Sequence, residues 1–207
     1  DEIYELILKK EFKHYSLSTL ANDLKERIFI INGFAKGWAM TGWRIGYLVG
    51  PKDVIKASSA LQSQSTSNVC SFVQKGALEA LKINNEFFSM INSQYDQRRC
   101  LLYEGLKNIN GIYIKEPNGA FYAFPRLPNS SIKSVDFCNK ALQDHGLVVV
   151  PGKAFGADKC IRISCAASEE KIKDGLNRLE KAISEYYWFQ LKMFNLKKFL
   201  LGSTLLF

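Results

Sequence analysis

The chain has 207 residues, of which 47% are hydrophobic and 23% are charged, so it can bury a core and does not belong to the disordered class. Five cysteines without a C-x-x-C spacing, together with only two histidines, argue against a disulfide framework and against a zinc site. The net charge is +8, but the lysines and arginines are spread along the chain, which argues against a nucleic-acid-binding surface. The sequence has neither a secretory signal pattern nor a long apolar run, so we expect a cytoplasmic protein with no membrane span.

The first part of the chain predicts two strands and then a helix. It begins with DEIYELIL, without methionine and directly in an apolar segment, so we expect a piece of a longer protein. The run IFII, residues 28–31, ends in Asn-Gly, which predicts a short buried strand followed by a turn. TGWRIGYLVG, residues 41–50, predicts a second strand, and Pro51 with Asp53 suits the first turn of a helix.

The remainder predicts helices that alternate with short strands. Apolar residues recur at helical spacing over 67–82, 84–109, 135–146 and 168–187. Short β-rich runs, punctuated by proline and glycine, lie at 112–117, 119–125, 146–152 and 161–167. This alternation predicts an α/β protein.

The last segment, WFQLKMFNLKKFLLGSTLLF at 188–207, has a different composition, apolar and basic. Phe189, Met193, Leu196 and Leu200 share one helical face with lysines nearby, the pattern of a helix that lies on a membrane surface. The same pattern fits packing on the protein body or an aberrant chain end, and we favour these two interpretations.

One stretch identifies a family. NGFAKGWAMTGWRIGYLVGPKDVIKA, residues 32–57, followed by SQSTSN, resembles the cofactor-lysine region of class I aminotransferases, which are fold-type I pyridoxal-phosphate enzymes, and is most similar to the bacterial-type aspartate aminotransferase branch. The resemblance runs from Asp1 to about Tyr187. It implies the C-terminal half of such an enzyme: 1–85 as the last part of the large mixed-sheet cofactor domain, 86–187 as the small α+β domain, and 188–207 as an atypical tail.

In this family the lysine that matches Lys36 bonds covalently to pyridoxal 5'-phosphate and moves the proton during catalysis. Such a lysine must be able to lose its charge. Burial beside Phe34, Trp38 and Met40 and the nearby cation of Arg44 would both favour that loss. The competing interpretation is an ordinary surface lysine.

Arg44 matches the arginine that anchors the cofactor phosphate in the family. Its planar guanidinium can give two parallel hydrogen bonds to phosphate oxygens, which an ammonium cannot do. The family often has serine or threonine near the lysine as a second phosphate donor, whereas this sequence has Gly33, Phe34 and Ala35 there. Compared with such relatives, this sequence therefore has fewer side chains near Arg44 that could also donate a hydrogen bond to the phosphate.

Asp1 and Tyr4 match two further cofactor residues. The aspartate keeps the pyridine nitrogen protonated, and the tyrosine hydrogen-bonds the phenolic oxygen of the cofactor. Strand alternation would send residues 1 and 4 to opposite faces, so the strand must end at about Asp1 and the chain must turn before Tyr4. The competing interpretation of Asp1 is an ordinary carboxylate at the chain end.

Arg162 lies in IRISCAAS, where alternation sends Ile161, Ile163 and Cys165 one way and Arg162 and Ser164 the other. By resemblance it is the arginine that binds the substrate α-carboxylate with two hydrogen bonds. A surface arginine on an edge strand is the alternative.

The resemblance implies ping-pong transfer of an amino group from an L-amino acid, aspartate or glutamate, to a 2-oxo acid. It also implies a homodimer, because the loop that holds Ser67 and Asn68 approaches the partner subunit's active site in the family. The arginine that one animal-type branch uses for the distal carboxylate is absent from LQSQSTSN, so the aspartate-type assignment depends on the bacterial-type branch.

Two other classes would share Lys36, namely the effector-sensing domain of a transcription regulator and a carbon–sulfur lyase on the same fold. An upstream winged helix would indicate the first, and cleavage of a β-thio amino acid would indicate the second. The sequence also lacks the family's glycine-containing phosphate loop, its ring-stacking aromatic residue and the asparagine beside the phenolic oxygen. We therefore expect little or no transaminase activity from the chain alone.

Overall fold

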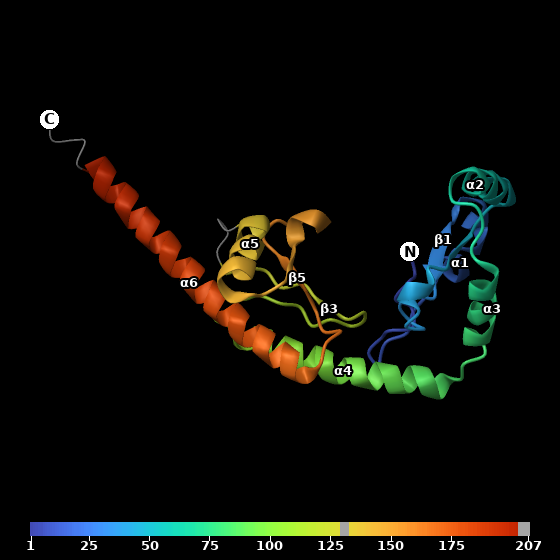
Figure 1. Ribbon diagram of the computed structural model, residues 1–207, viewed down its shortest axis with the longest axis horizontal. Helices are drawn as coiled ribbons and strands as arrows, with labels where there is room; N and C mark the ends of the chain where they lie inside the picture. The colour runs from blue at the N-terminus through green and yellow to red at the C-terminus, as the bar shows by residue number, and fades with distance from the viewer. Residues whose placement is uncertain (129–132, 203–207) are drawn as a thin grey trace. The chain divides into compact units, whose positions relative to one another are not determined.

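The computed structural model describes the backbone of residues 1–128 and 133–202, with the side chains of these residues except 22 and 187–202 (Figure 1). The chain forms two compact units. Unit 1 comprises Asp1–Gln94 with Asn118–Ala120, and unit 2 comprises Tyr95–Pro117 with Phe121–Phe207. The assignment of these parts to a large cofactor domain and a small domain stays a prediction.

Unit 1 contains short helices, one two-stranded sheet and two longer helices. In chain order these are α1 Leu17–Leu20, η1 Asn22–Arg27, β1 Ile30–Gly33, η2 Thr41–Trp43, β2 Gly46–Val49, α2 Lys52–Ser65 and α3 Ser71–Ala80. The long helix α4, Asn85–Asn108, contributes to both units. The predicted helices are confirmed, with Pro51 at the N-cap of α2 and Asp53 in its first turn.

The sheet of unit 1 confirms both predicted strands in part. The strand predicted over 41–50 covers only Gly46–Val49, because Thr41–Trp43 forms η2, and two further details are corrected. β1 and β2 pair antiparallel from Ile30 opposite Val49 to Gly33 opposite Gly46, so the Asn-Gly pair lies within β1 and the turn begins after it. The expectation of a buried strand is wrong for Ile31, which is 56% exposed, because in the described chain this sheet consists of two strands only.

The two glycines that face each other across this sheet allow its strands to meet closely. A Cβ atom on Gly33 would lie 2.9 Å from the Cα atom of Gly46, and one on Gly46 would lie 2.8 Å from the carbonyl oxygen of Asn32. Both distances are shorter than a side-chain carbon permits. The glycines therefore fix the point at which the hairpin opens into the loop that holds Lys36.

Unit 2 holds a three-stranded antiparallel sheet in the order β3-β5-β4. Its elements are β3 Tyr122–Ala123, α5 Ser134–His145, β4 Val150–Pro151, η3 Gly152–Phe155, β5 Ile161–Ser164 and α6 Glu169–Gly202. The β-rich run 112–117 contributes only an isolated bridge, from Tyr113 to Arg126. The four β-rich predictions are thus confirmed as three short strands and one bridge.

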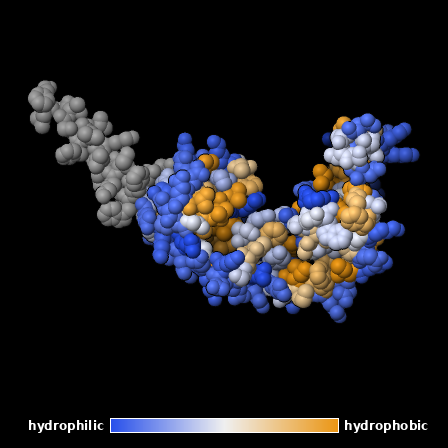
Figure 2. Space-filling view, in the orientation of Figure 1, coloured by the Kyte–Doolittle hydropathy of each residue, from blue (hydrophilic) through white to orange (hydrophobic). Residues whose placement is uncertain are grey.

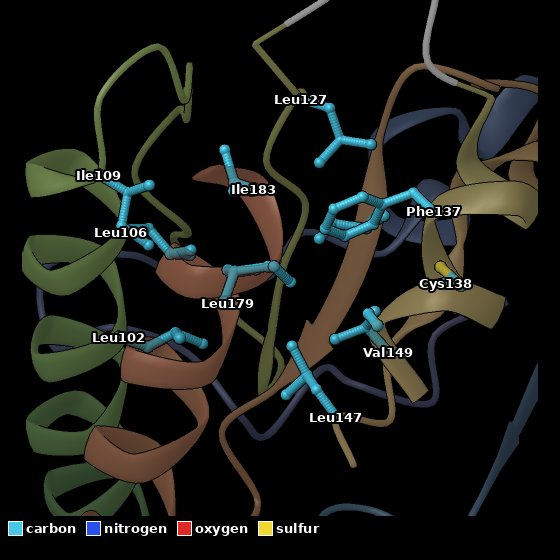
Figure 3. Close-up of a cluster of buried hydrophobic side chains, with 14 of the residues drawn as sticks. Leu102, Leu106, Ile109, Leu127, Phe137, Cys138, Leu147, Val149, Leu179 and Ile183 are labelled. Carbon is cyan, nitrogen blue, oxygen red and sulfur yellow. The ribbon is translucent and has the colours of Figure 1, made fainter. Parts of the chain in front are cut away.

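The core of unit 2 is formed by the predicted apolar faces of its helices and strands (Figure 3). Buried side chains from α4, α5, α6 and the strand segments meet there, among them Leu102, Leu106, Ile109, Phe137, Leu147, Val149, Leu179 and Ile183. α4 and α6 touch at Gly105, where a Cβ atom would lie 2.3 Å from a methyl carbon of Leu176. This burial is the main term that stabilises the unit.

α6 begins where the sequence predicts and continues further than expected. The Ser168 hydroxyl accepts a hydrogen bond from the Lys171 N–H at 3.3 Å, which caps the first turn. The backbone then stays helical to Gly202. The prediction that Phe189, Met193, Leu196 and Leu200 share one face lies outside the described side chains.

Exposed apolar side chains are present in both units (Figure 2). Val148 is 79% exposed, Leu61 is 72% exposed and Phe72 is 71% exposed. Single exposed apolar side chains of this kind are common on protein surfaces. No helix within the described residues is both long enough and apolar enough to cross a membrane.

The five cysteines are free thiols in different environments, and they provide a test of the core. Burial raises the pKa of Cys138 and of Cys165 to about 11, whereas Cys70 and Cys100 are exposed. At pH 8 a thiol with that pKa is only about 0.1% thiolate, the form that reacts. We expect a thiol reagent to modify Cys70 and Cys100 first, and Cys138 and Cys165 only after denaturation. Peptide mapping reads the order, and fast native labelling of Cys165 would contradict this core.

Candidate functional site

Lys36 lies on a turn in the loop that joins β1 to β2. The loop closes on itself, because the Ala39 N–H donates to the Lys36 carbonyl at 3.1 Å and the Met40 N–H donates to the Phe34 carbonyl at 3.2 Å. Lys36 itself is half-buried. The backbone around the predicted cofactor lysine is therefore fixed by the loop's own hydrogen bonds.

Apolar side chains on both sides of Lys36 attach this loop to α3. Phe34 and Met40 are buried and form a cluster with Ala77 and Ala80, against which Trp38 packs. The Trp38 indole N–H donates to the Ala80 carbonyl at 3.1 Å, and its ring lies 4.8 Å from that of Phe34. The three apolar neighbours predicted for Lys36 thus belong to the core of unit 1.

Two residues of the loop adopt a backbone conformation that side chains disfavour. Ala39 has φ of 55° and Arg44 has φ of 53°, both in the left-handed region. A residue other than glycine pays on the order of 1–2 kcal/mol there. Since the surrounding packing and hydrogen bonds hold both residues in place, the loop has a defined rather than an adaptable shape.

Arg44 presents its guanidinium at the exposed end of the same loop. One nitrogen, Nη1, donates to the Thr41 carbonyl at 2.8 Å, which orients the group. In the described part of the chain Arg44 has no carboxylate partner. Its remaining N–H donors can therefore hold an anion, and the arrangement fits the phosphate group predicted from the sequence.

A turn at 3–6 directly follows Asp1 and Glu2 and contains Tyr4. The Glu2 N–H donates to the Ile31 carbonyl of β1 at 2.8 Å, and the Glu5 N–H then donates back to the Glu2 carbonyl at 2.9 Å. Asp1 is exposed, and its carboxylate accepts from the Ile3 N–H at 3.1 Å. The chain thus begins to turn before Tyr4, as expected, and Tyr4 itself lies within the turn.

The turn at 3–6 packs directly on the lysine loop. A Cβ atom on Gly37, the residue after Lys36, would lie 2.8 Å from a methyl carbon of Leu6. A Cβ atom on Gly33 would lie 3.5 Å from a methyl carbon of Ile3. Unit 1 therefore brings the segment that holds Asp1 and Tyr4 against the loop that holds Lys36 and Arg44.

A buried polar connection between these two segments was missed from the sequence. Asn32 is only 4% exposed. Its side-chain amide donates to the Glu5 carboxylate at 2.6 Å, and its side-chain oxygen accepts from the Gly33 N–H at 2.7 Å. The only signal was the Asn-Gly pair, which indicated a turn rather than a bridge.

Further polar groups surround Asn32. Partial burial and the carboxylates of Glu5 and Glu2 raise the pKa of Tyr47, while its hydrogen bond with Asn32 lowers it, so the phenol stays neutral near pH 7. The side chains of Glu2, Glu5 and His14 each have one atom of a kind that can bind a metal ion, and these atoms lie within 4.8 Å of one another. His14 Nε2 lies 3.5 Å from a Glu2 oxygen. These groups connect the first residues of the chain to the sheet.

Replacing Asn32 by alanine tests this connection. The change leaves the Glu5 carboxylate and the Gly33 N–H without their partner, so we expect a loss of about 1–3 kcal/mol in the free energy of unfolding, measured by urea denaturation. Asn177 is exposed on α6, and its replacement by alanine is the matched control. Equal stability of both variants would refute the bridging role of Asn32.

Arg162 belongs to unit 2 and lies on β5, the middle strand of the sheet. Ile161 and Cys165 are fully buried on one side of this strand, and Arg162 with Ser164 faces the other way, as alternation predicts. The alternative prediction, that Arg162 lies on an edge strand, is wrong, because β5 lies between β3 and β4. In the described part of the chain Arg162 has no carboxylate partner, so its guanidinium can bind one.

Ser67 and Asn68 follow α2 in an exposed turn. Ser67 has φ of 60°, and its N–H donates to the Gln62 carbonyl at 3.0 Å. The predicted approach of this loop to a partner subunit stays a prediction.

A comparison of the whole sequence with known proteins identifies the family of this chain. Residues 1–179 match the family model of class I and II aminotransferases. The chain belongs to the class I and II aminotransferase family. Members of this family use pyridoxal phosphate.

Individual aminotransferases agree with this assignment. The chain is 39% identical over 187 residues to an aspartate aminotransferase of Pyrococcus horikoshii, covering 88% of this chain and 47% of the relative. It is 40% identical over 192 residues to a probable aspartate/prephenate aminotransferase of Rickettsia felis, covering 88% of this chain and 47% of the relative. The crystal structure of the Rhizobium meliloti aspartate aminotransferase superposes with a TM-score of 0.83 at 37% identity, covering 89% of this chain and 48% of that one.

The chain thus spans about half the length of the aminotransferases it matches. These matches do not support the assignment of the chain to the C-terminal half in particular, which stays a prediction. The roles of Asp1, Tyr4, Lys36, Arg44 and Arg162 likewise stay predictions from the sequence.

Proposed function

We propose that this chain forms part of a pyridoxal-phosphate-dependent aminotransferase that moves an amino group between an L-amino acid and a 2-oxo acid by a ping-pong mechanism. The observation that carries the proposal is the fixed loop from Phe34 to Ile45. It holds Lys36 half-buried on an ordered turn, and it holds Arg44 with no acidic partner among the side chains that the structure describes.

The residues fit the groups of this cofactor. A lysine amine can bond to its aldehyde, and the free N–H donors of Arg44 suit its phosphate. Asp1 is exposed and can place a carboxylate against a protonated ring nitrogen, and Tyr4 lies within the turn at 3–6 that follows it. Bound pyridoxal phosphate would supply an electron sink for the substrate's Cα carbon.

Each of these residues would have a defined task. Arg44 would bind and orient the cofactor through its phosphate, and Asp1 would hold the proton on the ring nitrogen. The Lys36 amine would carry the proton that leaves and returns to the substrate carbon. Arg162 would orient the substrate through two hydrogen bonds to its α-carboxylate.

The names of the relatives, aspartate aminotransferase and probable aspartate/prephenate aminotransferase, favour aspartate as the amino donor and disfavour the regulator and lyase interpretations. A Thermus thermophilus aspartate aminotransferase that is 39% identical, with a TM-score of 0.79, was crystallised with maleate, a dicarboxylate. We further propose a homodimer located in the cytoplasm.

The test is to mix the purified chain with pyridoxal phosphate, reduce it with borohydride and map the labelled peptide by mass spectrometry. We expect the label on Lys36 only, because the loop would position this lysine, and no other, next to the bound cofactor. Label scattered over exposed lysines, at equal occupancy, would refute cofactor binding by this chain.

A further inference from the structure

Two aromatic rings lie against the guanidinium of Arg162. Its Cζ atom is 4.4 Å from the centre of the Tyr122 ring and 4.6 Å from the centre of the Phe155 ring. These distances are well within the range at which a cation is attracted to an aromatic face. All three residues belong to unit 2.

The two rings reach Arg162 from different elements. Tyr122 lies on β3, which pairs with β5 so that Tyr122 stands opposite Ser164, two residues beyond Arg162. Phe155 is the last residue of η3, and its ring also meets that of Phe124 at 5.8 Å in an edge arrangement. Arg162 lies on the central strand, β5, and is thus contacted by side chains from the elements on both sides of that strand.

Hydrogen bonds at its first two residues fix the helix that holds Phe155. The Gly152 N–H donates to the Cys160 carbonyl at 2.8 Å, at the start of η3. The next N–H, of Lys153, donates to the hydroxyl of Ser134, which is fully buried and itself donates to the Asp158 carboxylate at 2.8 Å. The exposed Phe155 ring is therefore attached to a rigid support.

Aromatic rings orient a cation without neutralising it. Arg99 in the same unit shows the other solution, since it is 3% exposed and forms an ion pair with Asp96. Arg162 has the rings of Tyr122 and Phe155 and, in the described part of the chain, no carboxylate. Its full charge and its N–H donors stay available to an incoming anion.

We propose that Tyr122 and Phe155 are positioning residues that hold the Arg162 guanidinium ready to bind a carboxylate. This inference rests on the proposed role of Arg162 in the aminotransferase. The rings limit the orientations of a long side chain, so less freedom is lost when the carboxylate binds. Lysine cannot replace the arginine, because an ammonium has neither the planar fork nor the stacking surface.

The test follows the Nε–H signal of Arg162 by NMR in the 207-residue chain labelled with 15N-arginine. The signal is assigned by its loss in Arg162→Lys. Ring currents are expected to displace it, and Phe155→Leu or Tyr122→Leu should each move it toward the position of a free arginine. Phe155→Tyr and Tyr122→Phe, which keep a ring, should restore it.

Succinate is then titrated into each protein, with chloride at equal ionic strength as the reference. Removing one ring is expected to weaken succinate binding at Arg162 about 2- to 10-fold, because a guanidinium that the ring no longer orients loses more freedom when the carboxylate binds. The control is Tyr103→Leu, which removes the ring 5.8 Å from the Lys107 ammonium and should change neither reading.

The outcomes separate the two proposals. Succinate binding that is equal in the wild-type chain and in both leucine variants overturns the positioning role and leaves the proposed function standing. A displaced Arg162 signal that succinate does not change in the wild-type chain overturns the carboxylate role of Arg162, and the positioning role with it.

Discussion

Replacing Lys36 by arginine is expected to abolish the borohydride-stable attachment of pyridoxal phosphate at this position. Arginine retains the length and charge of the half-buried side chain, so the loop around it should keep its hydrogen bonds. Its guanidinium stays protonated and cannot bond to the aldehyde as an amine does. Lys56 is exposed on α2, and Lys56→Arg is the control that should keep the label on Lys36.

The same substitution should also remove turnover. For this measurement the chain is joined to the part of the Pyrococcus horikoshii relative that it does not match, since it spans 47% of that protein. We expect Lys36→Arg to lower the transamination rate by at least about 10²–10⁴-fold, the share that a positioned acid–base group supplies. Unchanged turnover in a variant that has lost the label would refute the catalytic role of Lys36.

Replacing Gly152 by alanine is expected to destabilise unit 2 by about 3 kcal/mol, at the upper end of what one added methyl group costs. The new Cβ atom would lie 2.3 Å from the carbonyl oxygens of both Ala157 and Cys160. These are backbone atoms and cannot rotate away as a side chain can. Relief would require η3 to move, which would break the hydrogen bond from the Gly152 N–H to Cys160.

Gly175→Ala is the matched control, because it adds the same methyl group to the same unit. Its Cβ atom would meet only a methyl carbon of Leu147, at 3.9 Å, and Gly175 lies inside α6. Alanine favours a helix interior over glycine by about 0.8–1.0 kcal/mol, so this variant should be more stable than the wild type. Urea denaturation measures both changes, and equal stabilities would show that the turn at Gly152 can relax.

The sequence predicted the local elements well because each depends on neighbouring residues. A turn that begins before Tyr4 was expected because the roles that the resemblance gives Asp1 and Tyr4 conflict with strand alternation, and the two faces of the strand that holds Arg162 followed from alternation itself. Both are confirmed. The prediction of a buried first strand was wrong at Ile31, because burial depends on what covers a strand and not on its own composition.

The connections between elements could not be predicted in this way. Asn32 and Glu5 are 27 positions apart in the chain, and neither residue type indicates the other. Tyr122 and Phe155 likewise reach Arg162 from separate elements. Such contacts depend on how loops close and strands pair, which a pattern of neighbouring residues does not contain.

The sequence by itself determined the family, through a lysine and an arginine eight positions apart in a distinctive loop, and with it the chemistry that these residue types can perform. The tertiary structure alone decided which groups hold them. It placed Asn32 between the turn at 3–6 and the lysine loop, and it set two aromatic rings against Arg162. The physical reason is that residue chemistry is local, whereas burial and pairing are properties of the folded chain.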